Sequence, residues 1–248
     1  MLDQEAIERL SNTLVSRAGG YLRNPVRQDS VTCLVCTTPV AGYRHCFACN
    51  NHRTHEGLAD ASAFLTYAIA GQQSAYVMRG YKARPPVDEH RSIVALLLAM
   101  GLSRHAACPD ALGGISVTHW ASVPSLPSRP GEHPLHKIIG TMAPGAEVGL
   151  SAAEYTSLPR VVSPDHFRLD TPLPRDSHVL LIDDTWTGGG HAQSAVLALR
   201  RAGAGRVSLL VVARWINKDF QDNARFLRGL SDHDYDPKIC PWTGGSCP

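Results

Sequence analysis

The clearest pattern of apolar and polar positions lies in the last third of the chain. Residues 179–182 are four consecutive apolar residues of the kind that favours strands, and polar residues flank them on both sides. Such a run is typical of a strand that is buried on both faces, as in a parallel sheet. Asp183 and Asp184 follow where this strand is expected to end, and residues 185–190 form a turn rich in threonine and glycine. A helix is predicted for residues 192–202, because its apolar positions recur at helical spacing and a glycine follows it.

The rest of the chain alternates between segments typical of helices and segments typical of strands. We expect helices at residues 2–17, 55–70, 88–102 and 219–230, and strands at residues 76–82, 114–124 and 206–212. This alternation indicates an α/β fold, with an open, mostly parallel sheet flanked by helices. Ligands of such sheets bind at the carboxyl ends of the strands, where the acidic pair and its turn are expected.

Four of the cysteines form two Cys-x-x-Cys pairs a few residues apart: Cys33, Cys36, Cys46 and Cys49. Two such turns together supply four thiolates, which predicts a closed, structural Zn²⁺ site. A segment this short has little core of its own, so the metal would supply folding energy. Two alternatives are that His45, His52 or His55 replaces a thiolate, and that the cysteines are free thiols. We divide the chain into a small N-terminal zinc-binding module at residues 1–54 and an α/β domain at residues 55–248.

Composition narrows the classes of protein. Hydrophobic residues make up 44% of the 248 residues, which is enough for a substantial core. The 24 basic residues nearly balance the 22 acidic ones, so direct nucleic-acid binding is not expected. The chain shows neither an apolar run that could span a bilayer nor a signal-peptide pattern. The seven cysteines, an odd number with metal-like spacing, favour a reducing compartment, and we expect a cytoplasmic protein. Near the C-terminus, Cys240 and Cys247 are interpreted as free thiols on a mobile tail, with metal binding beside His233 or oxidative pairing as alternatives.

The acidic pair beside a glycine-rich turn favours a phosphosugar ligand. Two carboxylates repel a phosphate unless hydroxyl groups or a cation intervene, as the ribose hydroxyls and Mg²⁺ would do at Asp183 and Asp184. The phosphate would lie on the amides of the turn and the positive end of the helix. The chain has neither the Gly-Lys-Ser/Thr of a P-loop nor the Gly-x-Gly-x-x-Gly of a dinucleotide site here. An ordinary strand, turn and helix without a ligand is the alternative.

Three further positions are candidates for contacts with a ligand. Small residues and an arginine follow the strand at residues 114–124 and precede a helix, which favours a second anion site at Ser125, Leu126, Pro127, Ser128 and Arg129. Lys82 is either an anion contact or an ordinary surface lysine. Trp215 either stacks on a planar substrate or belongs to the core.

Residues 179–191 resemble the PRPP-binding loop of the type I phosphoribosyltransferases, with four apolar residues, two acids and a Thr/Gly-rich turn. The order of motifs over residues 31–215 is similar to that of ComF-type phosphoribosyltransferases: a four-cysteine module, a Tyr81-Lys82 pair, a Val-Pro strand end, a loop with arginine, and then the acidic pair. The family has Lys-Tyr where this chain has Tyr81-Lys82, and the usual sequence of its PRPP-binding turn is Thr-Thr-Gly-x-Thr. Here residues 187–191 read Thr-Gly-Gly-Gly-His, so two hydroxyl groups are missing.

This resemblance implies that PRPP is bound with Mg²⁺ and that an unidentified acceptor displaces pyrophosphate. Asp183 and Asp184 would be the catalytic pair on the ribose. The 5′-phosphate would lie on Thr185, Trp186, Thr187, Gly188, Gly189, Gly190 and His191. The pyrophosphate would lie on Lys82 and on Ser125 to Arg129, a loop in which the family usually has a strained, non-proline cis peptide bond.

The resemblance also places a mobile loop over residues 144–174, with Arg160, Arg168 and Arg175 as candidate cations, and an acceptor contact at Trp215. Two other functions remain open at this point. One is a non-catalytic ComF-like protein of DNA uptake or recombination, and the other is a regulator that senses PRPP or a nucleotide. A homodimer is an open alternative to a monomer.

Overall fold

A parallel sheet forms the centre of the computed structural model, which describes residues 2–126, 131–140, 142–153 and 161–248. Its strand order is β1-β7-β6-β2-β3, and every neighbouring pair is parallel. These strands are β1 (Ala61–Ile69), β2 (His119–Ser122), β3 (Ala146–Glu147), β6 (His178–Trp186) and β7 (Arg206–Ile216). A separate antiparallel pair consists of β4 (Leu150–Ala152) and β5 (Phe167–Leu169). The predicted α/β class with a parallel sheet is confirmed.

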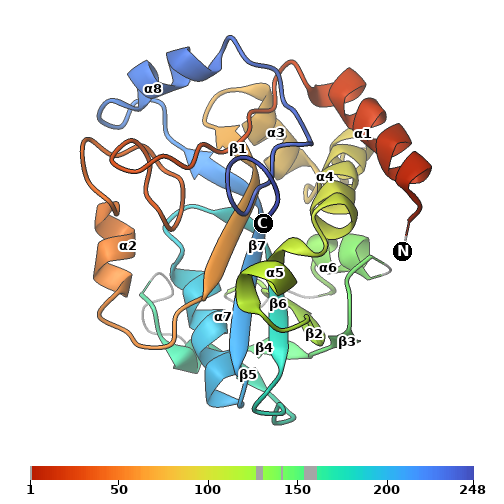
Figure 1. Cartoon of the computed structure of the whole chain (residues 1–248), viewed down its shortest axis with the longest axis vertical. Coiled ribbons are helices and arrows are strands. Elements are labelled where there is room, and N and C mark those ends of the chain that lie inside the picture. The colour runs from red at the N-terminus through yellow and green to blue at the C-terminus, as the bar shows by residue number, and fades with distance from the viewer. Residues whose placement is uncertain (1, 127–130, 141, 154–160) are drawn as a thin grey trace.

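Helices cover both faces of this sheet (Figure 1). The helices of the described residues are α1 (Gln4–Ala18), α2 (Phe47–His52), α3 (Gln73–Gly80), α4 (Asp88–Ala99) with a π-helical end (Met100–Arg104), α5 (Cys108–Gly113), α6 (Pro134–Ile139), a 3-10 turn (Pro164–His166), α7 (Gly190–Arg201) and α8 (Asn223–Leu230). Residues of α1, α4 and α6 share one core with Leu180 and Ile182, whereas α7 shares the other with Val179 and Leu181. The apolar run in β6 therefore serves two cores. No helix in the described part of the chain is long and apolar enough to cross a membrane.

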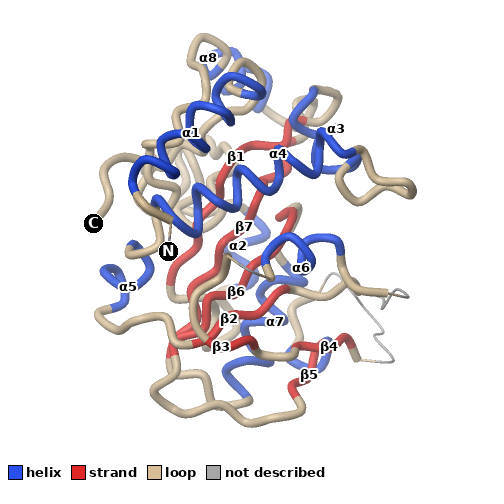
Figure 2. Tube along the Cα trace, turned by 90° about the vertical axis from the view of Figure 1, so that its right-hand side faces the viewer, coloured by secondary structure: helices blue, strands red, loops and turns tan. Residues whose placement is uncertain are grey.

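Two predicted helices form close to their expected bounds and pack side by side, α1 and α4 (Figure 2). In α1 the side chain of Asp3 accepts a hydrogen bond from the amide of Ala6 at 2.7 Å, which caps the helix. In α4, a continuous run of buried residues from Leu96 onward faces the sheet and α1. The helix predicted at residues 219–230 begins later, at Asn223, and the strand predicted at residues 114–124 is limited to β2.

The helix predicted for residues 55–70 is wrong, because this segment contains β1. Phe64, Leu65, Ala68 and Ile69 are spaced as on a helical face, which suggested a helix. In the structure every residue from 63 to 69 is buried, with Phe64 in one core and Leu65 in the other. Pairing along β7 decides the conformation, since a fully buried strand and a buried helix have similar apolar patterns.

The strand predicted for residues 76–82 is also wrong, because α3 occupies most of it. Ser74, at the start of α3, accepts a hydrogen bond from the amide of Ile69 at 3.0 Å and so ties the helix to β1. Val77 and Met78 are buried, whereas Tyr76 is exposed, as expected for a helix with one face on the protein. The β-favouring residues Tyr76 and Val77 are therefore overridden by packing.

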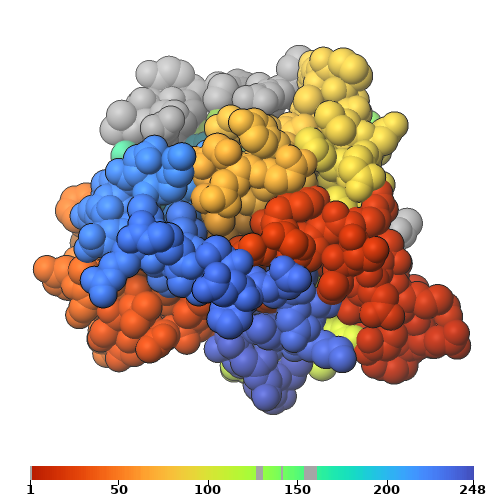
Figure 3. All heavy atoms as spheres, turned by 90° about the horizontal axis from the view of Figure 1, so that it is seen from above, coloured from red at the N-terminus to blue at the C-terminus, as the bar shows by residue number. Residues whose placement is uncertain are grey.

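The C-terminal segment after α8 packs along the N-terminal part of the chain (Figure 3). The amide of Tyr235 donates to the carbonyl of Gly19 at 3.0 Å. The side chain of Asn24 donates to the Asp236 carbonyl at 2.9 Å and accepts from the Asp236 amide at 2.8 Å. Trp242 is buried. The interpretation of this segment as a mobile tail is therefore wrong.

Candidate functional site

The sheet changes its direction of winding between β2 and β6. After β2 the chain continues to β3 on one side, and after β6 it continues to β7 on the other. Parallel sheets bind ligands in the crevice at such a point, at the carboxyl ends of the two strands. The pairing of β2 with β6 ends at Ser122 and Ile182, so Asp183 and Asp184 lie just beyond it, toward the carboxyl end of β6.

The strand that carries the acidic pair is longer than predicted. β6 continues to Trp186 because Asp183, Thr185 and Trp186 still pair with β7. The predicted end of the strand at Ile182 is correct only on the side of β2. The backbone around the acidic pair is therefore held by β7 on one side, whereas its pairing with β2 has already ended on the other.

Asp184 is held by side chains from two other segments. Tyr81 Oη donates to Asp184 Oδ2 at 2.5 Å, and Lys82 Nζ donates to the same oxygen at 2.6 Å. His133 Nε2 lies 3.9 Å from this oxygen. His133 Nδ1 accepts a hydrogen bond from the amide of Leu135 at the start of α6. In the neutral ring the proton is therefore on Nε2, the nitrogen nearer Asp184. We call these five residues (Tyr81, Lys82, His133, Asp183 and Asp184) the acidic edge.

The two carboxyl groups of the acidic edge differ in charge. Burial, and then the negative charge of Asp184, raise the pKa of Asp183 to about 8. Burial opposes ionisation of Asp184 as well, but the charge of Lys82 and the hydrogen bonds from Lys82 and Tyr81 outweigh it and lower its pKa. At pH 7 the pair therefore carries about one negative charge, which Lys82 offsets. We expected two carboxylates to repel a phosphate, but protonation of Asp183 and pairing of Asp184 with Lys82 largely remove this repulsion.

The turn after β6, residues 187–191, depends on glycine; we call it the glycine turn. Gly189 has a φ of +88°, and a Cβ placed there would lie 2.0 Å from the ring of Trp186. Trp186 is buried in the core and meets Phe64 edge-to-face, with ring centroids 5.7 Å apart. The buried ring of Trp186 thus packs against the turn, whereas the resemblance implied that Trp186 contacts the phosphate.

Helix α7 begins within the glycine turn, at Gly190. No described side chain caps this helix, and the first amides of any helix lack acceptors within it. Thr185 Oγ1 is buried and has no hydrogen-bond partner among the described residues. Such a group costs free energy unless a ligand or water satisfies it.

Arg214 holds the other side of the glycine turn, a contact that was not predicted from the sequence. Its Nη1 donates to the carbonyls of Trp186 at 2.9 Å and Thr187 at 3.0 Å, and also to that of Trp215. Only 6% of the residue is exposed. A lone arginine in the apolar run of β7 is the signal in the sequence, since a buried charge has to be paired.

The second predicted anion site is described only in part. Ser125 and Leu126 follow the end of β2, whereas Pro127, Ser128 and Arg129 lie outside the described residues. Among described peptide bonds, only the one before Pro85 is cis, and neither Ser125 nor Leu126 has a positive φ. The non-proline cis peptide bond that the resemblance implies for this loop is therefore absent from the part of it that the structure describes.

Two other predicted contacts are engaged within the protein. Trp215 is half-buried against the core, and the guanidinium of Arg79 lies 4.9 Å from the centre of its ring. Lys82 forms an ion pair with Asp184.

Of the three predicted loop cations, Arg168 is in β5, Arg175 lies beside Gly205, and Arg160 is outside the described residues. The segment before β5 is attached to α7, where the Ser163 amide donates to Ser194 Oγ at 2.9 Å.

The four cysteines of the two pairs meet in one place, which we call the four-cysteine cluster (Cys33, Cys36, Cys46 and Cys49). Their sulfur atoms all lie within 4.8 Å of one another, and the Sγ atoms of Cys36 and Cys46 are 3.7 Å apart. Two thiolates bound tetrahedrally to one Zn²⁺ lie about 3.8 Å apart. The amide of Cys49 donates to Cys46 Sγ at 3.5 Å, which favours a thiolate. None of the three candidate histidines belongs to this group, so the four-thiolate set fits a closed metal site.

The four-cysteine cluster is packed onto β1. Ser62 Oγ donates to the carbonyl of Val35 at 2.6 Å, and Tyr67 Oη donates to that of Thr37 at 2.7 Å. Three of the cysteines share a core with Phe64 and α7. A metal in this cluster would therefore stabilise the edge of the sheet as well as its own segment.

No family model matches this chain, and none of the curated proteins is similar enough in sequence to be matched to it. Function therefore has to be inferred from the residues of the acidic edge and the glycine turn, since many activities share this type of sheet.

Proposed function

We propose that this chain is a phosphoribosyltransferase-like protein that binds PRPP with Mg²⁺ at the acidic edge, where an acceptor displaces pyrophosphate. One observation carries the proposal. The acidic pair and the uncapped glycine turn lie together at the carboxyl end of β6, next to the point where the winding of the sheet reverses. This combination suits a ligand with hydroxyl groups at one end and a phosphate at the other.

The 5′-phosphate would bind at the glycine turn. The amides at the start of α7 and the positive end of its dipole favour an anion there. Gly188 has open space where a side chain would be, so a ligand can approach the backbone closely. Thr185 Oγ1 would gain the hydrogen bond that the described residues do not provide.

The ribose hydroxyls would bind at Asp183 and Asp184. Asp184 is ionised and accepts hydrogen bonds, whereas the protonated Asp183 is able to donate one. Lys82 would then move from Asp184 to the pyrophosphate, which carries the larger negative charge. Mg²⁺ fits a site of carboxylate and phosphate oxygens and would stabilise the leaving pyrophosphate when bound.

Calorimetric titration of PRPP with and without Mg²⁺ tests the proposal. Replacing both Asp183 and Asp184 by Asn keeps the shape and removes the charge, and we expect PRPP affinity to fall at least tenfold, or about 1.4 kcal/mol. Asp234→Asn, at an exposed position in the C-terminal segment, is the control and should bind as wild type does. Equal affinity of the double variant and the control would contradict the assignment of the acidic pair.

Transfer is tested by following pyrophosphate release from PRPP in the presence of a panel of bases and amines. Binding without transfer, as in a sensor or a non-catalytic scaffold, is the second candidate. The missing hydroxyl groups in residues 187–191 favour it, since fewer donors would hold the phosphate. PRPP binding without pyrophosphate release would select this candidate, and no binding at millimolar PRPP would exclude both.

A further inference from the structure

A second group of cysteine and histidine side chains lies where the C-terminal segment meets the end of α4. It consists of His105, Cys108, Cys240 and Cys247, and we call it the tail cluster. One ligand atom from each residue lies within 4.8 Å of the other three. The Sγ atoms of Cys108 and Cys240 are 3.6 Å apart, and His105 Nδ1 lies 3.3 Å from Cys247 Sγ. These residues come from positions as far apart as 142 in the sequence.

These distances fit four ligands around one metal ion. With Zn–S of about 2.3 Å and Zn–N of about 2.0 Å in a tetrahedron, two sulfur atoms lie about 3.8 Å apart, and a nitrogen and a sulfur about 3.5 Å apart. A disulfide would require the sulfur atoms to be about 2.05 Å apart. All seven cysteines have free thiols in this structure. The observed separations therefore match a shared metal ion better than a bond between the sulfurs.

The ring of His105 is oriented as in a metal ligand. Its Nε2 lies 3.0 Å from the carbonyl oxygen of Pro237, which only accepts hydrogen bonds, so Nε2 carries the proton. In the neutral ring this leaves the lone pair of Nδ1 directed toward Cys247. Metal-bound histidines characteristically use one ring nitrogen for the metal and donate the other to a carbonyl or carboxylate.

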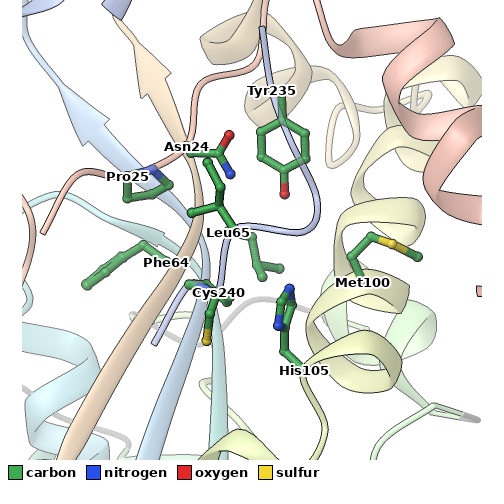
Figure 4. A pocket seen from close by; sticks show the side chains of 10 residues that line it. Asn24, Pro25, Phe64, Leu65, Met100, His105, Tyr235 and Cys240 are labelled. Atoms are coloured by element: carbon green, nitrogen blue, oxygen red, sulfur yellow. The ribbon is translucent and has the colours of Figure 1, made fainter. Parts of the chain in front are cut away.

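The surroundings support a closed site. His105, Cys108 and Cys240 are buried, and Figure 4 shows His105 and Cys240 beside a small pocket that Met100 and Tyr235 also line. The Cys240 amide donates to the Gly245 carbonyl at 2.8 Å, and the Gly244 amide donates back to the Cys240 carbonyl at 2.8 Å. This tight loop turns the chain back and brings Cys247 to the other three residues.

We propose that the tail cluster binds a second Zn²⁺, held by three cysteines and one histidine, that fastens the C-terminal segment to the end of α4. Four protein ligands leave no open position, so the role is structural. The metal would join Cys108 to Cys240, 132 positions apart, and so restrict a long loop in the unfolded chain. The C-terminal segment, which has no regular secondary structure after α8, is thereby held against the core.

The zinc content of protein purified without added metal tests this proposal. We expect about two equivalents per chain in wild type and about one in Cys247→Ser. Cys247 is exposed, so its substitution leaves the core intact. Ser246→Ala, at the neighbouring exposed position, is the matched control and should retain two equivalents. Cys33→Ser should remove the other equivalent, and the double variant Cys33→Ser/Cys247→Ser should hold none.

Thiol counting in denaturant with a chelator separates metal binding from oxidation. Seven reactive thiols are expected in wild type. One equivalent of zinc in both wild type and Cys247→Ser would overturn the proposal, and so would the loss of two thiols to a disulfide between Cys108 and Cys240. Limited proteolysis adds a readout that does not depend on metal analysis, because Cys247→Ser should be cleaved in the C-terminal segment at a protease concentration that leaves Ser246→Ala intact.

Discussion

The acidic edge and the four-cysteine cluster satisfy their polar groups in different ways. At the acidic edge, Asp184 is paired with Lys82 and Tyr81, and Asp183 is protonated, so the site is stable without a ligand. In the four-cysteine cluster, mostly buried thiols face one another without an opposite charge among them. A ligand site that is already neutralised can be emptied and refilled, whereas a cluster of thiolates holds together only with a metal. At neutral pH, loss of a side chain should therefore affect ligand binding most at the first region and stability most at the second.

Removing a ligand of the four-cysteine cluster should have the largest effect on stability. We expect Cys36→Ser to lose one equivalent of zinc and to lower the free energy of unfolding by about 5 kcal/mol or more, since structural zinc contributes about 10–16 kcal/mol in small domains. Thermal unfolding and metal analysis measure the two effects. His45→Gln, a neighbour outside the cluster, is the control and should keep both the metal and the stability. An unchanged melting temperature in Cys36→Ser would remove the distinction between the two regions.

Asp183→Asn should change how the free energy of unfolding depends on pH. The pKa of Asp183 is raised to about 8, so the folded protein holds this proton more tightly than the unfolded chain does. The stability that results is complete below the ordinary pKa of aspartate and is lost as the pH rises toward 8. Asn has no proton to lose. Each pH unit in this window is worth about 1.4 kcal/mol, so the variant should gain up to about 4 kcal/mol relative to wild type between pH 5 and pH 8. Unfolding in denaturant at several pH values measures this gain, and a difference that does not change with pH would show that Asp183 is ionised throughout.

Arg27→Met should weaken the connection of both cysteine clusters to the sheet. The Arg27 guanidinium donates to the carbonyl of Leu34 in the four-cysteine segment at 3.2 Å, to that of Pro241 beside the tail cluster at 3.3 Å, and to that of Ser62 in β1. Met fills part of the space but leaves these carbonyls without their donor, so we expect a loss of about 3 kcal/mol. Arg44→Met is the matched control, because the Arg44 side chain is 71% exposed. Denaturant unfolding of the two variants should differ, and equal stabilities would contradict this role.

Two neighbouring glycines test whether the glycine turn is a rigid part of the ligand site. Gly189→Ala should cost about 2 kcal/mol, because alanine is strained at positive φ and its Cβ would meet the ring of Trp186. Gly188→Ala meets nothing within 4 Å and should leave stability within about 0.5 kcal/mol of wild type. Thermal unfolding measures both, and PRPP titration of the same proteins shows whether the turn holds the phosphate. A larger loss of stability in Gly188→Ala than in Gly189→Ala would contradict the geometry of the turn.

Local patterns in the sequence determined several parts of this protein. The apolar run of β6, the start of α7 beside the run of three glycines and the amphipathic α1 follow from neighbouring residues alone. The four-cysteine cluster was predictable because all four cysteines lie within one short segment and their spacing is that of zinc sites. Such features depend on contacts between residues that are close in the chain.

Only the tertiary structure decided the features that depend on distant contacts. Whether residues 61–69 form a strand was decided by pairing with β7, because a buried strand and a buried helix share similar apolar patterns. The partners of Asp184 come from about a hundred positions earlier and from the start of α6, and Arg214 reaches the glycine turn from the next strand. His105 and Cys108 have no recognisable spacing to Cys240 and Cys247, so the tail cluster appears only when the fold brings both ends of a long loop together.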